Sequence, residues 1–188
     1  REGERITEPA TVADTIAQDR VSREPTSSAN RTFSVLTLPD GTKINVYEKG
    51  VEDAMIKFLQ SDEYKEATDD DLKEKWFEFD NIAFEFGSGT ELKSESKVQL
   101  DNIASILKNY KDAKIKIAGF ADKKGTETAN MKVSQERAKT VESLLEKRGV
   151  GSQVVKVQGY GDEYAKHSAS ESDAQRAEDR DIALRFVK

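Results

Sequence analysis

The stretch AGFADKKGTETANMKVSQERA, residues 118–138, decides the fold because it joins a strand pattern to a helix pattern. Upstream, AKIKIAGF at residues 113–120 alternates apolar with polar residues, which is typical of a half-buried strand. Downstream, an apolar stripe recurs at helical spacing until Gly149, a residue well suited to end a helix. The stripe consists of Ala138, Val141, Leu144 and Leu145. The stretch is therefore predicted to form a strand–loop–helix unit.

The same two patterns repeat on both sides of this unit. WFEFDNIAFEF, residues 76–86, predicts a strand with a break at Asp80-Asn81. Residues 94–110 predict a helix with Ser94 or Ser96 as its N-cap. Two further strands are predicted from SQVVKVQGYG (152–161) and DIALRFVK (181–188).

This order of elements indicates the fold class. Strand, helix, strand, helix, strand and a final strand indicate an α/β fold, an α+β two-layer sandwich with the helices on one face of the sheet. The first three strands are predicted to be parallel neighbours joined by right-handed crossovers.

The N-terminal part of the chain adds a second group of elements. TFSVLTLPDGTKINVYEKG, residues 32–50, predicts a β-hairpin that turns at Asp40-Gly41. Residues 51–64 predict an amphipathic helix, and the charged run at 65–75 a solvated helix end or loop. Residues 1–31 are polar, and we expect a tether or arm. The predicted division is therefore an arm at 1–31, a hairpin and helix extension at 32–75, and a domain at 76–188.

Composition excludes several classes of function. The chain has 188 residues, 36% of them apolar, which suffices for one sizeable core. Its net charge of −6 disfavours nucleic acid and anionic lipid surfaces as partners. No apolar run is long enough for a membrane helix, and no signal segment is present. Because the sequence does not begin with Met, we expect attachment to a membrane only through a lipid anchor or signal segment that has been removed.

Residue usage also argues against catalysis, metals and cofactors. The chain has no cysteine, and its one histidine, His167, lies in a polar loop where we expect a solvated side chain. Thiolate or histidine metal sites and cysteine nucleophiles are therefore excluded or hard to assemble. We expect no enzyme activity and no cofactor.

Asp122 and Arg137 are the candidate functional pair. A strand end and the first turns of the following helix are neighbours, so these residues, fifteen positions apart, are expected to lie close together. An acid can receive an ammonium group, and an arginine can bind a carboxylate through two hydrogen bonds, so the pair suits a zwitterionic amino acid group. The spacing alone leaves a structural salt bridge or two solvated charges as the alternative.

Several motifs in residues 76–188, about 60% of the chain, resemble the OmpA-like C-terminal domain family of OmpA, Pal and MotB proteins. The residues that carry the resemblance are Gly119-Phe120-Ala121-Asp122, Gly125, Asn130, Val133-Ser134, Arg137-Ala138, Gly149-Val150, Gly159-Tyr160-Gly161-Asp162-Glu163 and Arg176-Ala177-Glu178-Asp179-Arg180-Asp181-Ile182. The resemblance implies a β-α-β-α-β-β core.

The resemblance also implies non-covalent binding of peptidoglycan in the periplasm or at the outer membrane of a Gram-negative envelope. In this family the ligand is diaminopimelate of the peptide stem. Carried over, Asp122 takes the ammonium, Arg137 takes the carboxylate, and Asn130 bonds the ligand or caps the helix. Phe120, at the family's aromatic or His position, is either a wall of the site or strand packing.

Departures from the family pattern support a second hypothesis. Ala121 stands where Thr is usual, and Asp179 and Asp181 replace Asn and Arg, so we expect a rim with less positive charge and weaker binding. The alternative is a scaffold of the same fold with a decayed ligand site. In that case the segment from Thr32 to Leu59 contacts an envelope protein partner.

Overall fold

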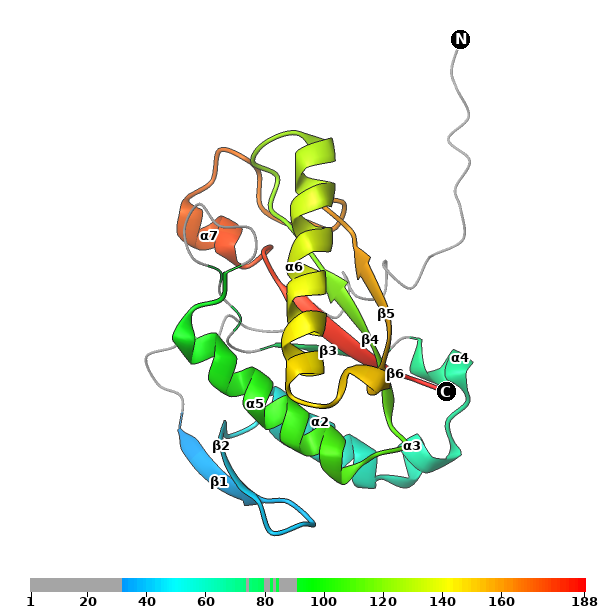
Figure 1. Ribbon diagram of the computed structural model, residues 1–188. Helices are drawn as coiled ribbons and strands as arrows, with labels where there is room; N and C mark the ends of the chain where they lie inside the picture. Colours follow the sequence, from blue (N-terminus) through cyan, green and yellow to red (C-terminus); the bar gives the residue numbers. More distant parts are fainter. Residues whose placement is uncertain (1–31, 74, 80–81, 83, 85–90) are drawn as a thin grey trace.

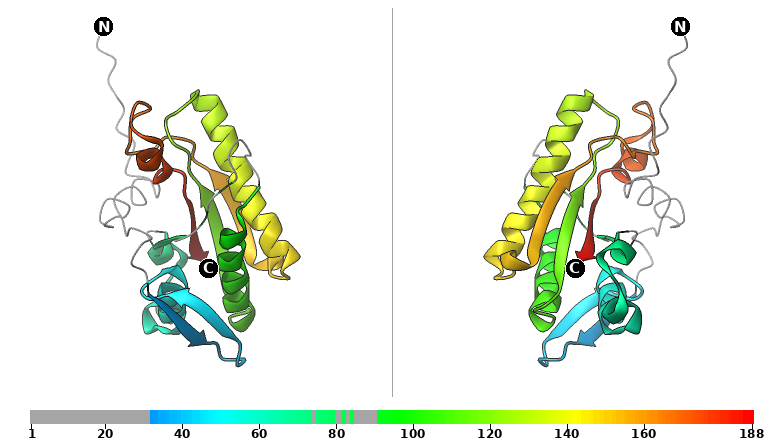
Figure 2. Two further views of the ribbon diagram at one scale, coloured as in Figure 1. Left: turned by 90° about the vertical axis from the view of Figure 1, so that its left-hand side faces the viewer. Right: turned by 90° about the vertical axis from the view of Figure 1, so that its right-hand side faces the viewer.

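The computed structural model describes residues 32–73, 75–79, 82, 84 and 91–188. The predicted arm and the predicted strand break at Asp80-Asn81 lie outside these residues. The described chain forms two layers, with a four-stranded sheet behind two long helices (Figure 1). The helices are α5 (Ser94–Asn109) and α6 (Glu127–Lys147). Both lie on the same side of the sheet in the two views of Figure 2. The predicted α/β two-layer class is confirmed.

The strand order in this sheet is β3–β6–β4–β5. The four strands are β3 (Trp76–Glu78), β4 (Lys114–Gly119), β5 (Val154–Gly159) and β6 (Ile182–Val187). β4 and β5 are parallel, but β6 pairs antiparallel with both β3 and β4. The prediction that β3 and β4 are neighbours is therefore wrong. The first five residues of β6 are all buried, as an interior strand requires, whereas β3 has only three residues and occupies an edge.

Two helix starts differ from expectation. The N-cap of α5 is Lys93, not Ser94 or Ser96, and Lys93 makes no side-chain capping bond. The N-cap of α6 is Thr126, whose hydroxyl accepts a hydrogen bond from the backbone N–H of Ala129. After α6 a short 3₁₀ turn, η2 (Gly151–Gln153), leads into β5.

The N-terminal segment forms the expected hairpin from β1 (Phe33–Thr37) and β2 (Lys43–Tyr47). Gly41 in its turn has a φ of 88°, a conformation that glycine adopts without steric cost. The helix predicted at residues 51–64 begins as expected, but it ends at Gln60 as α2 (Val51–Gln60), and Ser61 separates it from the next helix. The charged run, expected to be a solvated helix end or loop, contains the end of α3 (Asp62–Glu66) and all of α4 (Asp69–Leu72), where Leu72 is fully buried.

A single apolar cluster joins the N-terminal segment to the rest of the chain. It includes residues of the hairpin, of α2, of the inner sheet face and of both long helices, among them Val46, Met55, Leu100, Ile117, Val141 and Phe186. A second, smaller cluster lies on the other sheet face and contains Trp76, Ala118, Phe120, Tyr160 and Ala183. Within the described ranges, no helix combines the length and apolar character needed to cross a membrane.

Candidate functional site

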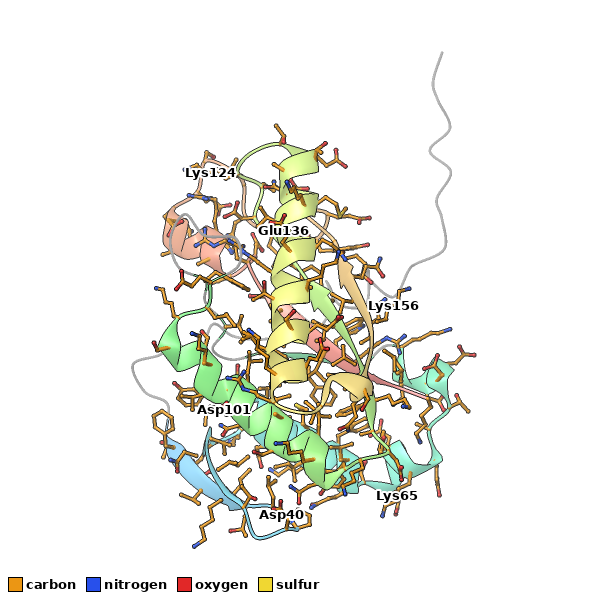
Figure 3. The ribbon with its side chains drawn as sticks, in the orientation of Figure 1. Asp40, Lys65, Asp101, Lys124, Glu136 and Lys156 are labelled. Atoms are coloured by element: carbon orange, nitrogen blue, oxygen red, sulfur yellow. The ribbon has the colours of Figure 1, made fainter. Side chains whose placement is uncertain are left out.

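A cleft of about 430 Å³ opens where the β4–α6 loop, α6 and the segment around α7 (Asp173–Ala177) meet. The β4–α6 loop contributes Ala121, Asp122 and Lys124, and α6 contributes Asn130, Val133 and Arg137. In Figure 3, Lys124 marks this end of the molecule, and Asp40 marks the hairpin turn at the opposite end. The cleft therefore lies at the carboxyl end of β4, as the sequence predicts for a ligand site.

Two glycines set the position of α6 over the sheet. A Cβ atom on Gly119 would lie 2.2 Å from the carbonyl oxygen of Ser134, and one on Gly159 would lie 2.4 Å from the backbone nitrogen of Gln135. The helix backbone thus rests directly on the ends of β4 and β5. Two hydrogen bonds join the helix to the end of β5, one from Gly159 N–H to the Gln135 side chain and one from Gly161 N–H to the Ser134 hydroxyl. This contact fixes the cleft-facing residues of α6.

Asp122 is the most heavily bonded group in the cleft. Its Oδ2 accepts hydrogen bonds from Arg180 at 2.9 Å and from Arg176 at 3.2 Å, and its Oδ1 accepts the backbone N–H of Lys124 at 2.8 Å. The Asp122 and Arg176 side chains are 9% and 8% exposed. Asp122 therefore belongs to a buried ionic cluster with two arginines, and no ion pair with Arg137 is formed.

Arg137 lines the same cleft but lies apart from this cluster. Its guanidinium carbon is 5.0 Å from the centre of the Phe84 ring, within the range of a cation–π contact. Its buried Nε has no hydrogen-bond partner within the described chain. Burial lowers the pKa of Arg137 from its ordinary value, the positive charge of Arg180 lowers it further, and Asp122 opposes both. Among the described residues, no acid forms an ion pair with Arg137, although the charge of Asp122 acts on it.

Asn130 and Phe120 have different surroundings. Asn130 lines the cleft, and its side-chain amide donates to Asp162 at 3.0 Å, which ties α6 to the loop after β5. The helix cap expected as one role of Asn130 is instead Thr126. Phe120 is 1% exposed and stacks on Tyr160 with 5.4 Å between ring centres. The structure thus brings together Asp122, Asn130 and Arg137, whereas Phe120 packs in the cluster on the other sheet face.

The segment after β5 supplies two cleft arginines to which the sequence assigned no role. Arg176 lies on α7 and Arg180 just after it, and both contact Asp122. Asp173, at the start of α7, pairs with Arg180 at 2.9 Å and with Arg176 at 3.6 Å. The only signal in the sequence was the family's C-terminal signature, which contains both arginines.

Asp179 does not lie on the rim of the cleft, where it was expected to reduce the positive charge. Its side chain is fully buried, and its two carboxylate oxygens accept the backbone N–H groups of Lys166 and His167 at 3.0 and 2.9 Å. Asp181 is not among the residues that line the cleft. Asp179 therefore braces the loop before α7, since a buried carboxylate is stable only where it is well bonded.

His167 also differs from its prediction as a solvated side chain. Its side chain is 20% exposed, and the two ring nitrogens lie 3.2 Å from Glu171 and 3.0 Å from Glu178. The hydrogen bonds to Glu178 and Glu171 raise the pKa of His167 above its ordinary value. The imidazole thus links the loop before α7 to the residue that follows α7.

The described lining of the cleft is cationic. Among the described residues, five basic ones line it, Lys93, Lys124, Arg137, Arg176 and Arg180, against two acids, Asp122 and Asp173. This excess stands out in a chain whose net charge is −6. Such a site attracts carboxylates, and arginines bind them through paired hydrogen bonds. Within the described ranges, no three histidine or acidic side chains are placed to hold a metal ion.

Comparisons with known proteins point to one family. The profile of the OmpA family matches residues 83–180. Outer membrane protein P5 of Haemophilus influenzae is 35% identical over 81 residues, which cover 43% of this chain and 23% of that protein. The peptidoglycan-associated lipoprotein of Buchnera aphidicola is 32% identical over 98 residues, which cover 52% of this chain and 56% of that protein. The chain thus spans only part of these relatives.

A solved structure supports the fold. The periplasmic domain of Helicobacter pylori MotB (residues 97–256) superposes with a TM-score of 0.50 at 20% identity. The superposition covers 60% of this chain and 81% of that one. The fold is therefore shared although most residues differ.

Proposed function

Because the chain belongs to the OmpA family, we propose that it binds peptidoglycan non-covalently and so anchors part of the cell envelope. One relative is named as peptidoglycan-associated and another as an outer membrane protein. The expected location, periplasmic or associated with the outer membrane of a Gram-negative envelope, agrees with these relatives. Binding requires no bond to be broken.

The observation that carries this proposal is the environment of Arg137. Its guanidinium lines a cationic cleft, is held against Phe84 and retains a buried Nε without a hydrogen-bond partner in the described chain. A carboxylate that accepts two hydrogen bonds from this group would compensate both the charge and the missing bond. The cleft is thus suited to a ligand that brings carboxylates.

Diaminopimelate of the peptide stem fits this requirement, because its side-chain end carries a carboxylate and an ammonium on one carbon. We place the carboxylate on Arg137 and the ammonium towards Asp122, whose Oδ1 accepts only one hydrogen bond in the described chain and retains a second lone pair. Asn130 then braces the cleft through Asp162 and offers its amide oxygen to the ligand.

The test is a titration of the protein with free diaminopimelate and with a stem peptide that contains it, followed by calorimetry. Arg137→Ala should lose about 2 to 5 kcal/mol of binding free energy. Arg148→Ala is the matched control, because Arg148 caps the far end of α6 and pairs with Asp101 outside the cleft. Its binding should equal that of the wild type.

Asp122→Ala is a less direct probe, because it also removes the acid that Arg176 and Arg180 share. We expect this variant to lose about 3 kcal/mol of unfolding free energy, the cost of leaving buried charges unpaired. Arg137→Ala leaves no acid of the described chain unpaired and should unfold at nearly the urea concentration of the wild type. Undiminished binding by a folded Arg137→Ala protein would overturn the proposal.

The alternative, a scaffold that binds a protein through its N-terminal extension, has one observation in its favour. Phe33 and Val35 of the hairpin are 63% and 59% exposed. If neither diaminopimelate nor the stem peptide binds the wild-type protein, the cleft is a structural cluster of charges. The hypothesis of a scaffold that binds a protein partner is then preferred.

A further inference from the structure

Within the described residues, the outer edge of β1 has no partner strand. The Thr32 carbonyl accepts a hydrogen bond from Glu48 N–H at 2.9 Å, and Leu38 N–H donates to the Thr42 carbonyl at 2.8 Å. Both residues thus bond to the other side of the hairpin. Because the direction of backbone groups alternates along a strand, the N–H and C=O groups of Phe33, Val35 and Thr37 point away from β2. In the described chain, β1 pairs only with β2, so these groups form an open edge.

The side chains on this edge are also exposed and uncharged. Phe33 and Val35 project on the solvent side, and the whole strand reads FSVLT in a chain that is 35% charged. β5, at an edge of the larger sheet, also exposes an apolar residue, Val155, but carries Lys156 beside it. Charged residues, prolines and bulges are the usual protection of an edge strand against pairing. β1 contains no charged residue and no proline, and its register with β2 is regular.

We propose that β1 is a self-association surface on which a second copy of this chain pairs β1 with β1 in the antiparallel direction. A two-fold axis through Val35 places Val35 opposite its copy and Phe33 opposite Thr37 of the other chain. In this register the outward N–H and C=O groups of all three residues find partners, and the two hairpins form one four-stranded sheet.

Self-complementarity favours a copy over another occupant. The register places the apolar Val35 against its copy and Phe33 against the uncharged Thr37, and no like charges meet on the paired strands although each chain carries a net charge of −6. The hairpin lies at the end of the molecule opposite the α7 end (Figure 1), so both clefts stay open in the pair. This inference does not depend on what the cleft binds.

A cysteine cross-link tests the register directly, because the chain contains no cysteine. Val35→Cys places two thiols opposite each other across the axis, at a separation that a disulfide can bridge. Mild oxidation should convert this variant to a covalent dimer. Val155→Cys, an exposed valine on the other edge strand, is the control and should cross-link much more slowly. An equimolar mixture of Phe33→Cys and Thr37→Cys should give the mixed dimer.

Sedimentation equilibrium measures the unmodified association. The wild-type chain should form dimers in a concentration-dependent manner, and Val35→Lys should raise the dissociation constant by at least about tenfold, since two lysines would face each other on the axis. A chain that is monomeric up to roughly 100 µM, with Val35→Cys no faster to cross-link than Val155→Cys, would overturn the proposal. In that case residues 1–31 or a strand of another protein would be the occupant to test.

Discussion

His167 carries the clearest dependence on pH at the scale of single residues. Its ring nitrogens bond to Glu178 and Glu171, and its backbone N–H bonds to the buried Asp179. These carboxylates favour the imidazolium, so the folded-state pKa lies above the ordinary value of 6.5. Protonated His167 therefore stabilises the folded state. This stabilisation is fully present below about pH 6.5 and is lost as the pH rises through the folded-state pKa.

The prediction concerns the difference in free energy of unfolding between the wild-type protein and the His167→Gln variant. As the pH rises from about 6.5 to about 8.5, the wild-type free energy of unfolding should fall relative to that of the variant. Urea denaturation at several pH values measures it, and NMR titration of the imidazole gives its pKa. A variant whose stability follows pH in parallel with the wild type would contradict the prediction.

The residues of the cleft could be predicted only in part. Asp122, Asn130 and Arg137 belong to one strand–loop–helix unit, so their proximity follows from local connectivity. Arg176 lies on a five-residue helix that has no apolar stripe to reveal it, and Arg180 lies just after that helix. The burial of Asp179 depends on a loop folding back over it, which no local pattern encodes.

At the scale of elements, α6 depends on the absence of a side chain at Gly119. In Gly119→Ala the new methyl group would meet the Ser134 carbonyl at 2.2 Å, and neither backbone can move without displacing the helix. We expect a loss of about 3 kcal/mol in unfolding free energy, together with weaker ligand binding, because α6 carries Arg137.

Gly41→Ala separates this steric effect from backbone strain. Gly41 has a φ of 88°, but a Cβ there would meet nothing within 4 Å. The expected cost is only about 1 kcal/mol, with unchanged binding. Thermal unfolding and the diaminopimelate titration measure both variants. Equal effects of the two substitutions would show that close packing at Gly119 is not what positions α6.

The strand order shows the limit of prediction for elements. The alternation in AKIKIAGF predicts β4, and its parity also places Gly119 towards α6 and Phe120 on the opposite face, with Tyr160. The insertion of β6 between β3 and β4 depends on pairing across the whole domain. Periodicity identifies a strand, but it does not identify the neighbours of that strand.

At the scale of the whole molecule, the N-terminal extension shares the core of the OmpA-like part. Val46 and Met55 belong to the same apolar cluster as Ile117 and Phe186. We therefore propose that the predicted boundary between residues 75 and 76 separates units of sequence and not units of folding. The fold class was predictable because every element of the sheet layer has its own periodicity, whereas the packing of residues 32–75 on it has no local signal.

A truncated chain of residues 76–188 tests this view. Without the extension, the inner face of the sheet, which contains Phe186 and Ile117, becomes partly exposed to solvent. The fragment should therefore melt at a lower temperature and bind a hydrophobic dye. Circular dichroism and dye fluorescence measure both effects. A fragment as cooperative and stable as the full chain would instead support an independent domain.

The hairpin has a mechanical consequence if the cleft is held by the cell wall and tension arrives through the residues before Thr32. Thr32 and Glu48 lie at the open end of the hairpin and are joined by a hydrogen bond. A pull there loads the hydrogen-bonded pairs of the hairpin one after another, starting with Thr32 and Glu48, and never all at once. Each residue that separates from the hairpin adds about 3.5 Å to the extended length of the chain. The hairpin would thus unfold before the cleft releases its ligand, and its extension would limit the force that reaches the cleft.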